Sequence, residues 1–391
     1  MKTFRIQSFV LILLAFVLGF SEFIIVGILD DIARQFSVGI SVVGYLVTIF
    51  ALVYAISTPI VTMLIKDNLY RALLLLLFIF TFANLLTALA PSYAVLVLSR
   101  VITALVSGAA ISLAMTFATA IAPLERRAWL ISWIFSGFSI ASVFGVPLGT
   151  WISTTFDWRY TFATITAFSL LTILLVIRYL PRDISQQKSG GLSNQFIIFK
   201  DPRIFLSVLV ATFSLAGVYV FYTYLRPILS QALHYAPSMI TALLTIYGLM
   251  SLLSNQYSGR IADNGGLKVM PRAYIIELLA LVLMPLLLRS KVVGTVDVML
   301  VGALMYLINS PIQLHILNVA EKDYPQSMVL ASSLNSIFSN FGISLGSAIG
   351  GITVSQFGIQ NVGLGGAAFT ALTLFLLMVL NRQNETYRHE L

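Results

Sequence analysis

Long apolar runs, each about the length of a membrane-crossing helix, follow one another through almost the whole of this 391-residue chain. A helix needs roughly 20 predominantly apolar residues to cross a hydrocarbon core about 30 Å thick. Hydrophobic residues make up 59% of the sequence and charged residues 10%, whereas soluble domains carry roughly 25% charged residues. No soluble core could bury so much apolar surface, so we predict an all-α protein that lies in a lipid bilayer.

Charged and turn-forming clusters divide the apolar sequence into twelve predicted spans. Their approximate ranges are 8–29, 41–65, 72–90, 94–121, 128–153, 158–180, 204–231, 237–262, 268–288, 294–319, 328–356 and 361–381. The N-terminus has the basic-then-apolar pattern of a signal peptide, but its apolar stretch continues to Leu29 without a small-residue cleavage site. We therefore predict an uncleaved first span.

The distribution of basic residues predicts how the chain crosses the membrane. If both termini lie on the same side, seventeen of the 23 Lys and Arg residues fall on that side. The positive-inside rule then places both termini and the polar segment 183–203 in the cytoplasm. The same distribution explains the net charge of +8 without a nucleic-acid partner.

Six predicted spans precede the polar segment and six follow it, and the two sets contain related sequences. IFSGFSI at 134–140 in the fifth span matches IFSNFGI at 337–343 in the eleventh. Duplicated six-span halves are typical of transporters, which bind substrate near the bilayer midplane between the repeats. We predict an N-terminal half at 1–182, a cytoplasmic linker at 183–203 and a C-terminal half at 204–391.

Two loops resemble the loop signature of the major facilitator superfamily, G-x-L-A-D-R-x-G-R-K. The loop after the eighth span begins at Gly259 and includes Asp263 and Lys268, and the loop after the second span retains Asp67 and Arg71. The resemblance implies that these five residues form a cytoplasmic gate. Its four charged members would act as a charge latch that stabilises the outward-facing state and breaks on opening inward. The resemblance also implies two pseudo-symmetric six-helix halves in a bacterial plasma membrane.

The fifth span contains Gly137, Gly145, Pro147 and Gly149. This pattern is similar to the Gly-Pro motif that marks the drug:proton antiporters of the superfamily. The first half looks most like the branch of arabinose and sugar efflux, nucleoside efflux and chloramphenicol resistance. Glycine allows close helix approach and proline permits a kink, so we expect this span to pack tightly against a helix of the other half.

The resemblance implies a proton-coupled efflux antiporter that exports a small organic molecule, a drug, a sugar or a nucleoside, as a monomer and without a cofactor. A proton-coupled uptake symporter and a membrane receptor that does not transport remain alternatives. The sequence lacks a Gly-rich phosphate loop, H-E-x-x-H and G-x-S-x-G, so we do not expect an enzyme. The chain has no cysteine, which excludes disulfides, thiol nucleophiles and Cys-ligated metal sites.

Charged residues within spans are expensive and are candidates for proton coupling. Glu22, well inside the first span, is the main candidate to load and release a proton; the alternative is a structural carboxyl that is hydrogen-bonded to a neighbouring helix. Asp30 is eight residues further on a similar helix face, although a solvated position at the span end is the favoured interpretation. Arg100 either holds a deprotonated Glu22 or extends toward the outer interface. Glu277 is a secondary candidate, with a hydrogen-bonded structural role favoured.

Polar and aromatic side chains in the second half are candidates to line a substrate cavity. The residues are Tyr219, Tyr222, Asn309, Gln313 and Asn335. The amides need hydrogen-bond partners at membrane depth, and the tyrosines could stack on a planar ligand or bond to it. Helix-to-helix hydrogen bonds and interface anchoring explain many such residues, so the sequence does not decide which ones touch substrate.

Overall fold

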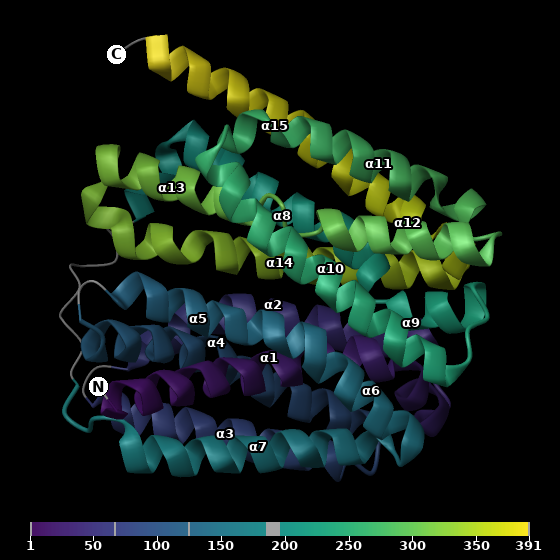
Figure 1. Cartoon of the computed structure of the whole chain (residues 1–391), viewed down its shortest axis with the longest axis horizontal. Coiled ribbons are helices and arrows are strands. Elements are labelled where there is room, and N and C mark those ends of the chain that lie inside the picture. The colour runs from purple at the N-terminus through teal and green to yellow at the C-terminus, as the bar shows by residue number, and fades with distance from the viewer. Residues whose placement is uncertain (1, 66–67, 124–125, 185–195, 390–391) are drawn as a thin grey trace. The chain divides into compact units, whose positions relative to one another are not determined.

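The computed structural model describes residues 2–65, 68–123, 126–184 and 196–389, and these ranges are almost entirely helical (Figure 1). Within them lie twelve helical spans long and apolar enough to cross a membrane. Their bounds are Phe4–Phe36, Ile40–Thr62, Leu69–Ala88, Tyr93–Ile121, Trp129–Thr155, Trp158–Tyr179, Pro202–Tyr222, Pro237–Asp263, Gly266–Leu287, Lys291–Asp323, Leu330–Phe357 and Ile359–Thr386. The prediction of an all-α, twelve-span membrane protein is therefore confirmed.

Contacts divide the chain into two compact units, which are described separately. Unit 1 consists of Met1–Gln187 and Ala236–Gly248, and unit 2 consists of Lys188–Tyr235 and Leu249–Leu391. The end of the predicted linker is part of unit 2, because Ile198 is completely buried in the apolar core of that unit.

Unit 1 contains the first six spans. Its helices are α1 (Lys2–Phe36), α2 (Ile40–Leu64), α3 (Leu69–Ala88), α4 (Tyr93–Ile121), α5 (Arg127–Ile140), the π-helical turn η2 (Ala141–Gly145), α6 (Val146–Thr155) and α7 (Trp158–Tyr179). Asn68, Ser92 and Asp157 precede α3, α4 and α7, and each side chain accepts a hydrogen bond from a backbone N–H of the first turn. Helix α1 packs against α2, α4, α5, α6 and α7, so it lies inside the unit.

Unit 2 contains the last six spans, with part of the eighth grouped with unit 1. Its elements are η4 (Phe196–Lys200), α8 (Pro202–Tyr222), α9 (Leu225–Pro227), η5 (Ile228–Ala232), α10 (Pro237–Asp263), η6 (Gly266–Lys268), α11 (Met270–Leu287), α12 (Lys291–Leu304), α13 (Asn309–Asp323), η7 (Pro325–Ser327), α14 (Met328–Phe357), η8 (Ile359–Asn361) and α15 (Val362–His389). Helix α8 packs against both α14 and α15, as α1 packs against α5, α6 and α7 in unit 1.

Small residues explain why the fifth span approaches α1 so closely. A Cβ added at Gly137 would lie 2.8 Å from the backbone oxygen of Ile12, and one at Gly145 would lie 2.9 Å from the Phe20 ring. Gly149 likewise faces the side chain of Ile24. These three glycines therefore face the first span of their own unit. The expected close approach to a span of the other half occurs at Val143 of the fifth span, because an added Cβ at Gly248 of the eighth span would lie 2.8 Å from the Val143 Cα.

The eleventh span repeats this arrangement in unit 2. Added Cβ atoms at Gly342, Gly346 and Gly350 of α14 would collide with backbone oxygens of α8. The three glycines are four residues apart and so share a helix face. Both units thus bring two helix backbones together along a face of small residues, the packing mode expected in membranes.

Two spans that the sequence predicted as continuous change geometry in the structure. In the fifth, the π-helical turn η2 ends two residues before Pro147, where a residue without a backbone N–H interrupts the normal ladder. In the seventh, predicted at 204–231, α8 ends at Tyr222 and a turn leads into α9 and η5.

The tenth span, predicted as continuous at 294–319, is also broken, because α12 ends at Leu304 and α13 begins at Asn309. Two serines of α10 stabilise the break. The backbone N–H of Tyr306 donates to the Ser254 hydroxyl at 3.0 Å, and that of Ser310 donates to the Ser258 hydroxyl at 2.8 Å. These bonds satisfy donors that a broken helix would otherwise leave without partners in the bilayer.

Candidate functional site

A buried polar network joins three helices of unit 1 around Arg100. The guanidinium donates from Nη1 to the Ser21 hydroxyl at 3.0 Å and from Nη2 to the Ser21 carbonyl at 2.8 Å. The Ser21 hydroxyl donates to Oδ1 of Asn84 at 2.7 Å, and the Asn84 amide donates to the Phe80 carbonyl at 2.9 Å. Helices α1, α3 and α4 are therefore linked through one serine hydroxyl.

Arg100 is one of the most deeply buried side chains in the protein, with 1% of its surface exposed. Its guanidinium carbon lies 4.5 Å from the ring centroid of Phe50 and 5.7 Å from that of Phe162. Aromatic faces stabilise a desolvated cation electrostatically. The structure thus places Arg100 inside the helix bundle, whereas the alternative from the sequence had it extending toward the outer interface.

Glu22 follows Ser21 on α1 and is partly buried. Its carboxyl is close enough to Arg100 of α4 and Tyr54 of α2 to interact electrostatically with both. Arg100 itself is hydrogen-bonded to neutral groups of Ser21. The main proton-coupling candidate and the buried arginine therefore lie in one site of unit 1.

At the end of α1, Asp31 joins this helix to α6. The Asp31 carboxylate accepts a hydrogen bond from the Ser153 hydroxyl of α6 at 2.5 Å and forms an ion pair with Arg34. Its side chain is 10% exposed. Asp30, one residue earlier, is partly buried.

Glu277 lies in unit 2, in a different site from Glu22. It is 3% exposed, and its Oε1 accepts a hydrogen bond from the Thr370 hydroxyl at 3.1 Å. Helices α11 and α15 are therefore joined by this contact. In the described part of unit 2, this carboxyl is hydrogen-bonded to a neutral hydroxyl, and no cation is hydrogen-bonded to it.

Side-chain amides of unit 2 meet beside the break in the tenth span. The Asn335 amide of α14 donates to Oδ1 of Asn309 at 3.1 Å, and the Asn309 amide donates to Oδ1 of Asn255 of α10 at 3.4 Å. Gln313 donates to the backbone oxygen of Ser332 at 3.5 Å. Two predicted cavity candidates, Asn309 and Asn335, are thus brought together beside Asn255.

The predicted tyrosines of α8 form a ring pair. The centroids of Tyr219 and Tyr222 are 5.1 Å apart with an edge-to-face orientation, and the side chains are 2% and 4% exposed. They are buried within unit 2 and contribute to its packing in this structure.

The structure describes four of the five loop residues expected to form the cytoplasmic gate. Asp67 lies outside the described residues. The Lys268 ammonium forms its ion pair with Glu385 of α15, at 3.1 Å, and no ion pair of Asp263 or Arg71 occurs among the described residues. Gly259 has open space around its Cα, so no close helix approach requires a glycine there.

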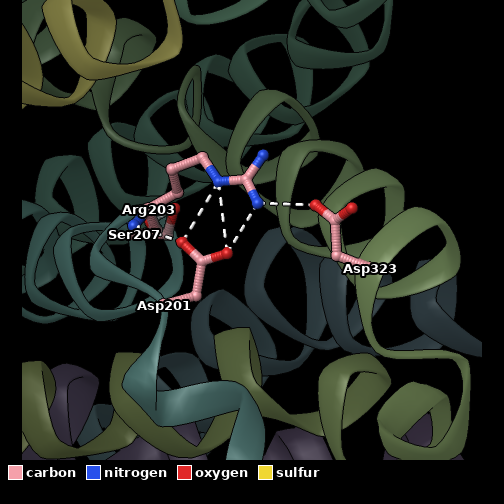
Figure 2. A network of polar contacts seen from close by, with 4 residues as sticks. All are labelled: Asp201, Arg203, Ser207 and Asp323. Carbon is pink, nitrogen blue, oxygen red and sulfur yellow. Dashed lines mark hydrogen bonds and ion pairs between the residues drawn. The ribbon is translucent and has the colours of Figure 1, made fainter. Parts of the chain in front are cut away.

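A denser ion-pair network lies where α8 begins and α13 ends (Figure 2). Arg203 donates from Nη2 to Asp201 and to Asp323, at 2.6 Å in each case, and from Nε to Asp201 at 3.1 Å. Burial acts to raise the pKa of Asp201, but the hydrogen bonds and charge of Arg203 outweigh it and hold that pKa below its usual value. The network fixes the end of the predicted linker to unit 2.

Sequence analysis did not identify four residues of these sites: Ser21, Asn84, Asp31 and Asn255. Asn84, an amide in the middle of an apolar span, was the available signal for the Arg100 network. Asp297 of α12 was also missed; it is 4% exposed, and its Oδ2 has no hydrogen-bond partner among the described residues.

Comparisons with known proteins agree with this architecture. Inner membrane transport protein YdhP of Escherichia coli (strain K12) is 30% identical over 378 residues, which cover 95% of each chain. A protein named probable sugar efflux transporter, from Helicobacter pylori strain J99, is 28% identical over 372 residues, covering 95% of this chain and 94% of the relative.

Solved structures show the same fold. A D-xylose-proton symporter superposes with a TM-score of 0.78 at 15% sequence identity, covering 95% of this chain and 97% of the other. An inward-facing, occupied bacterial homologue of the human lysosomal transporter Spinster gives a TM-score of 0.75 at 15% identity, with 96% of each chain covered. A family model described as Major Facilitator Superfamily matches residues 11–329 and 209–390. The chain is therefore a multi-pass membrane transporter of the Major Facilitator Superfamily.

Proposed function

We propose that this transporter is a proton-coupled efflux antiporter in which Glu22 carries the proton and Arg100 stabilises its deprotonated form. The observation that carries the proposal is the position of Glu22, inside the first span and within electrostatic reach of a deeply buried arginine. A carboxylate is expensive in a bilayer unless a cation is near, whereas a protonated carboxyl needs none. Glu22 can therefore exist in both states.

Arg100 supplies a fixed charge to this exchange. A guanidinium does not lose its proton in proteins, so Arg100 cannot carry the proton itself. Its hydrogen bonds to Ser21 and its aromatic neighbours hold the charge in place beside α1. Glu22 is therefore the residue that binds and releases the proton. A substrate that binds better to the protein with one charge state of Glu22 than with the other becomes coupled to the proton gradient.

The outward direction is supported by the Gly-Pro pattern of the fifth span, which is similar to that of drug:proton antiporters, and by a relative named probable sugar efflux transporter. A sugar is accordingly the first substrate class to test. The amides of Asn255, Asn309 and Asn335 are consistent with a neutral, hydroxyl-rich molecule, because amides can donate to and accept from hydroxyls. Drugs and nucleosides are the other classes to compare.

Inside-out membrane vesicles provide the test. With the vesicle interior acidified by respiration, sugars, nucleosides and hydrophobic drugs are added in turn to vesicles containing the wild type, Glu22→Gln or Glu277→Gln. We expect at least one compound to collapse the pH gradient and to accumulate inside wild-type and Glu277→Gln vesicles. Glu22→Gln vesicles should neither release protons nor accumulate it.

Three results would overturn parts of the proposal. Proton-coupled accumulation that persists in Glu22→Gln vesicles would show that another group carries the proton. Proton release without accumulation of the added compound would overturn antiport, because exchange must move the compound into the vesicles as protons leave them. Entry of the compound without proton release would likewise contradict exchange.

A further inference from the structure

We propose that Asn84 and Ser21 are positioning residues that hold the guanidinium of Arg100 by one edge and leave its Nε edge for the deprotonated carboxylate of Glu22. This inference rests on the proposed function and extends it to two neutral residues that touch neither proton nor substrate. Asn84 is completely buried on α3, and Ser21 is completely buried on α1.

The direction of the hydrogen bonds gives Asn84 its role. The amide of Asn84 donates to the Phe80 carbonyl at 2.9 Å, which turns its Oδ1 toward Ser21. The single hydroxyl hydrogen of Ser21 is donated to that Oδ1 at 2.7 Å. The lone pairs of the hydroxyl are then left to accept from Nη1 of Arg100 at 3.0 Å. Asn84 therefore determines that Ser21 acts as an acceptor toward the arginine.

The remaining edge of Arg100 is free of such partners. Both Nη groups are engaged by Ser21, through its hydroxyl and its carbonyl. The Nε–H is buried and has no hydrogen-bond partner among the described residues. A buried donor without a partner is costly, and carboxylates bind arginine best through two parallel N–H groups. Glu22 supplies the carboxylate that already interacts electrostatically with this arginine.

The other charged and titratable groups on the helices around α1 do not compete with Arg100 for the carboxylate of Glu22. Tyr54 of α2 is the second group that interacts electrostatically with Glu22. On α5 and α7 the charged residues stand at the helix ends: Arg127, Arg159 and Arg178. On α3 the charged residue is Arg71, in the first turn, and neither η2 nor α6 contains a titratable residue.

Loss of Asn84 should loosen the arginine and weaken its effect on Glu22. Without the Oδ1 acceptor, the Ser21 hydroxyl can rotate and no longer presents its lone pairs to Nη1. The charge of Arg100 then favours the carboxylate less, so Glu22 keeps its proton to a higher pH. For a nearby opposite charge the expected displacement of the midpoint is roughly one pH unit.

Infrared titration of the purified full-length protein measures this without a substrate. The carbonyl stretch of protonated carboxyls is followed against pH, and the Glu22 component is the one absent from Glu22→Gln. We expect the midpoint of this component to move upward by about one pH unit both in Ser21→Ala, which loses the hydroxyl that accepts from Nη1, and in Asn84→Leu, which loses the acceptor that orients this hydroxyl. Ser21→Thr, which restores a hydroxyl, should return the midpoint to that of the wild type.

Thr87→Val is the matched control. Thr87 is completely buried on α3, three residues from Asn84, and its hydroxyl bonds to Ser99, outside the network. A midpoint in Asn84→Leu and Ser21→Ala no different from that in Thr87→Val would overturn the positioning role while leaving Glu22 as the proton carrier. Absence of any band that depends on Glu22 would instead overturn the proposed function. If Asn84→Leu fails to fold, the comparison of Ser21→Ala with Ser21→Thr decides.

Discussion

Glu277 and Thr370 stand at positions of unit 2 that correspond to Thr81 and Ser169 of unit 1. Glu277 lies 196 positions after Thr81, and Thr370 lies 201 positions after Ser169. Asp263 likewise lies 196 positions after Asp67 in the two related loops. Thr81 and Ser169 are hydrogen-bonded and join α3 to α7, just as Glu277 and Thr370 join α11 to α15. The corresponding spans of both units are thus joined by a hydrogen bond, although the side chains that form it differ. This recurrence favours a structural role for Glu277.

We therefore expect Glu277→Gln to fold and transport like the wild type, because the amide oxygen can still accept the Thr370 hydroxyl. Glu277→Leu should lower the free energy of unfolding by about 1 kcal/mol through loss of this interhelical bond. Thermal unfolding in detergent and transport in vesicles would measure the two effects. A Glu277→Gln variant that is stable but uncoupled would show that this carboxyl also carries a proton.

The pH dependence of Asp201 is a second prediction for a single residue. Arg203 holds its pKa below the ordinary value, so the carboxylate stabilises the folded state above the pKa of the unfolded chain. This contribution should be lost as the pH falls below about 4 and through the still lower folded pKa. The melting temperatures of the wild type and Asp201→Asn should therefore differ at neutral pH and converge in acid. A constant difference across this range would contradict the ion-pair interpretation.

Individual helices show which features a sequence can predict. The existence of twelve spans follows from apolar length alone, because the requirement for about 20 residues is imposed by the bilayer. The break in the tenth span does not, because the groups that stabilise it are Ser254 and Ser258 of another helix. Pro311, near the start of α13, is the one local signal.

The same reasoning applies to the site. Glu22 and Arg100 stand out in the sequence because each is a charge within a span. Ser21 and Asn84 do not, since their importance comes from hydrogen bonds between α1, α3 and α4 that form only when the helices pack. The glycines of the fifth span predicted close helix packing, but the sequence alone did not show that the glycines themselves face α1. The spacing of small residues identifies a face of a helix and not the helix that packs on it.

At the level of helix packing, Gly346→Val should destabilise unit 2 strongly. An added side chain would collide with the backbone oxygen of Ala216 on α8, which cannot move aside as a flexible side chain would. We expect a loss of about 1–3 kcal/mol or failure to assemble. Gly259→Ala is the control, because nothing lies within 4 Å of the added Cβ. Unfolding in detergent would compare them, and equal stability of the two variants would contradict the packing described for α14.

For the whole molecule, alternating access predicts that each unit moves largely as a body. The chain has no cysteine, so spin labels can be introduced without a background. Distances from Arg178 to Arg272 and from Tyr160 to Val292 join exposed positions of the two units, and the distance from Arg178 to Tyr160 lies within α7. A pH change or an active substrate should alter the first two distances in opposite directions and leave the third unchanged. A change confined to distances within a unit would contradict this motion.

The packing of α1 and α8 also constrains the order in which the chain can assemble during synthesis. Helix α1 leaves the ribosome first, yet its partners include α5, α6 and α7, and α8 likewise packs against α14 and α15. The Gly137 face that receives α1 is made more than 100 residues later. Helix α1 can pack against α2 and α4 early, but its face toward α5, α6 and α7 stays uncovered until the last two spans of the unit are made. A chain that stops after the fourth span therefore already contains Ser21, Asn84 and Arg100 but lacks Phe162, which packs on the guanidinium from α7.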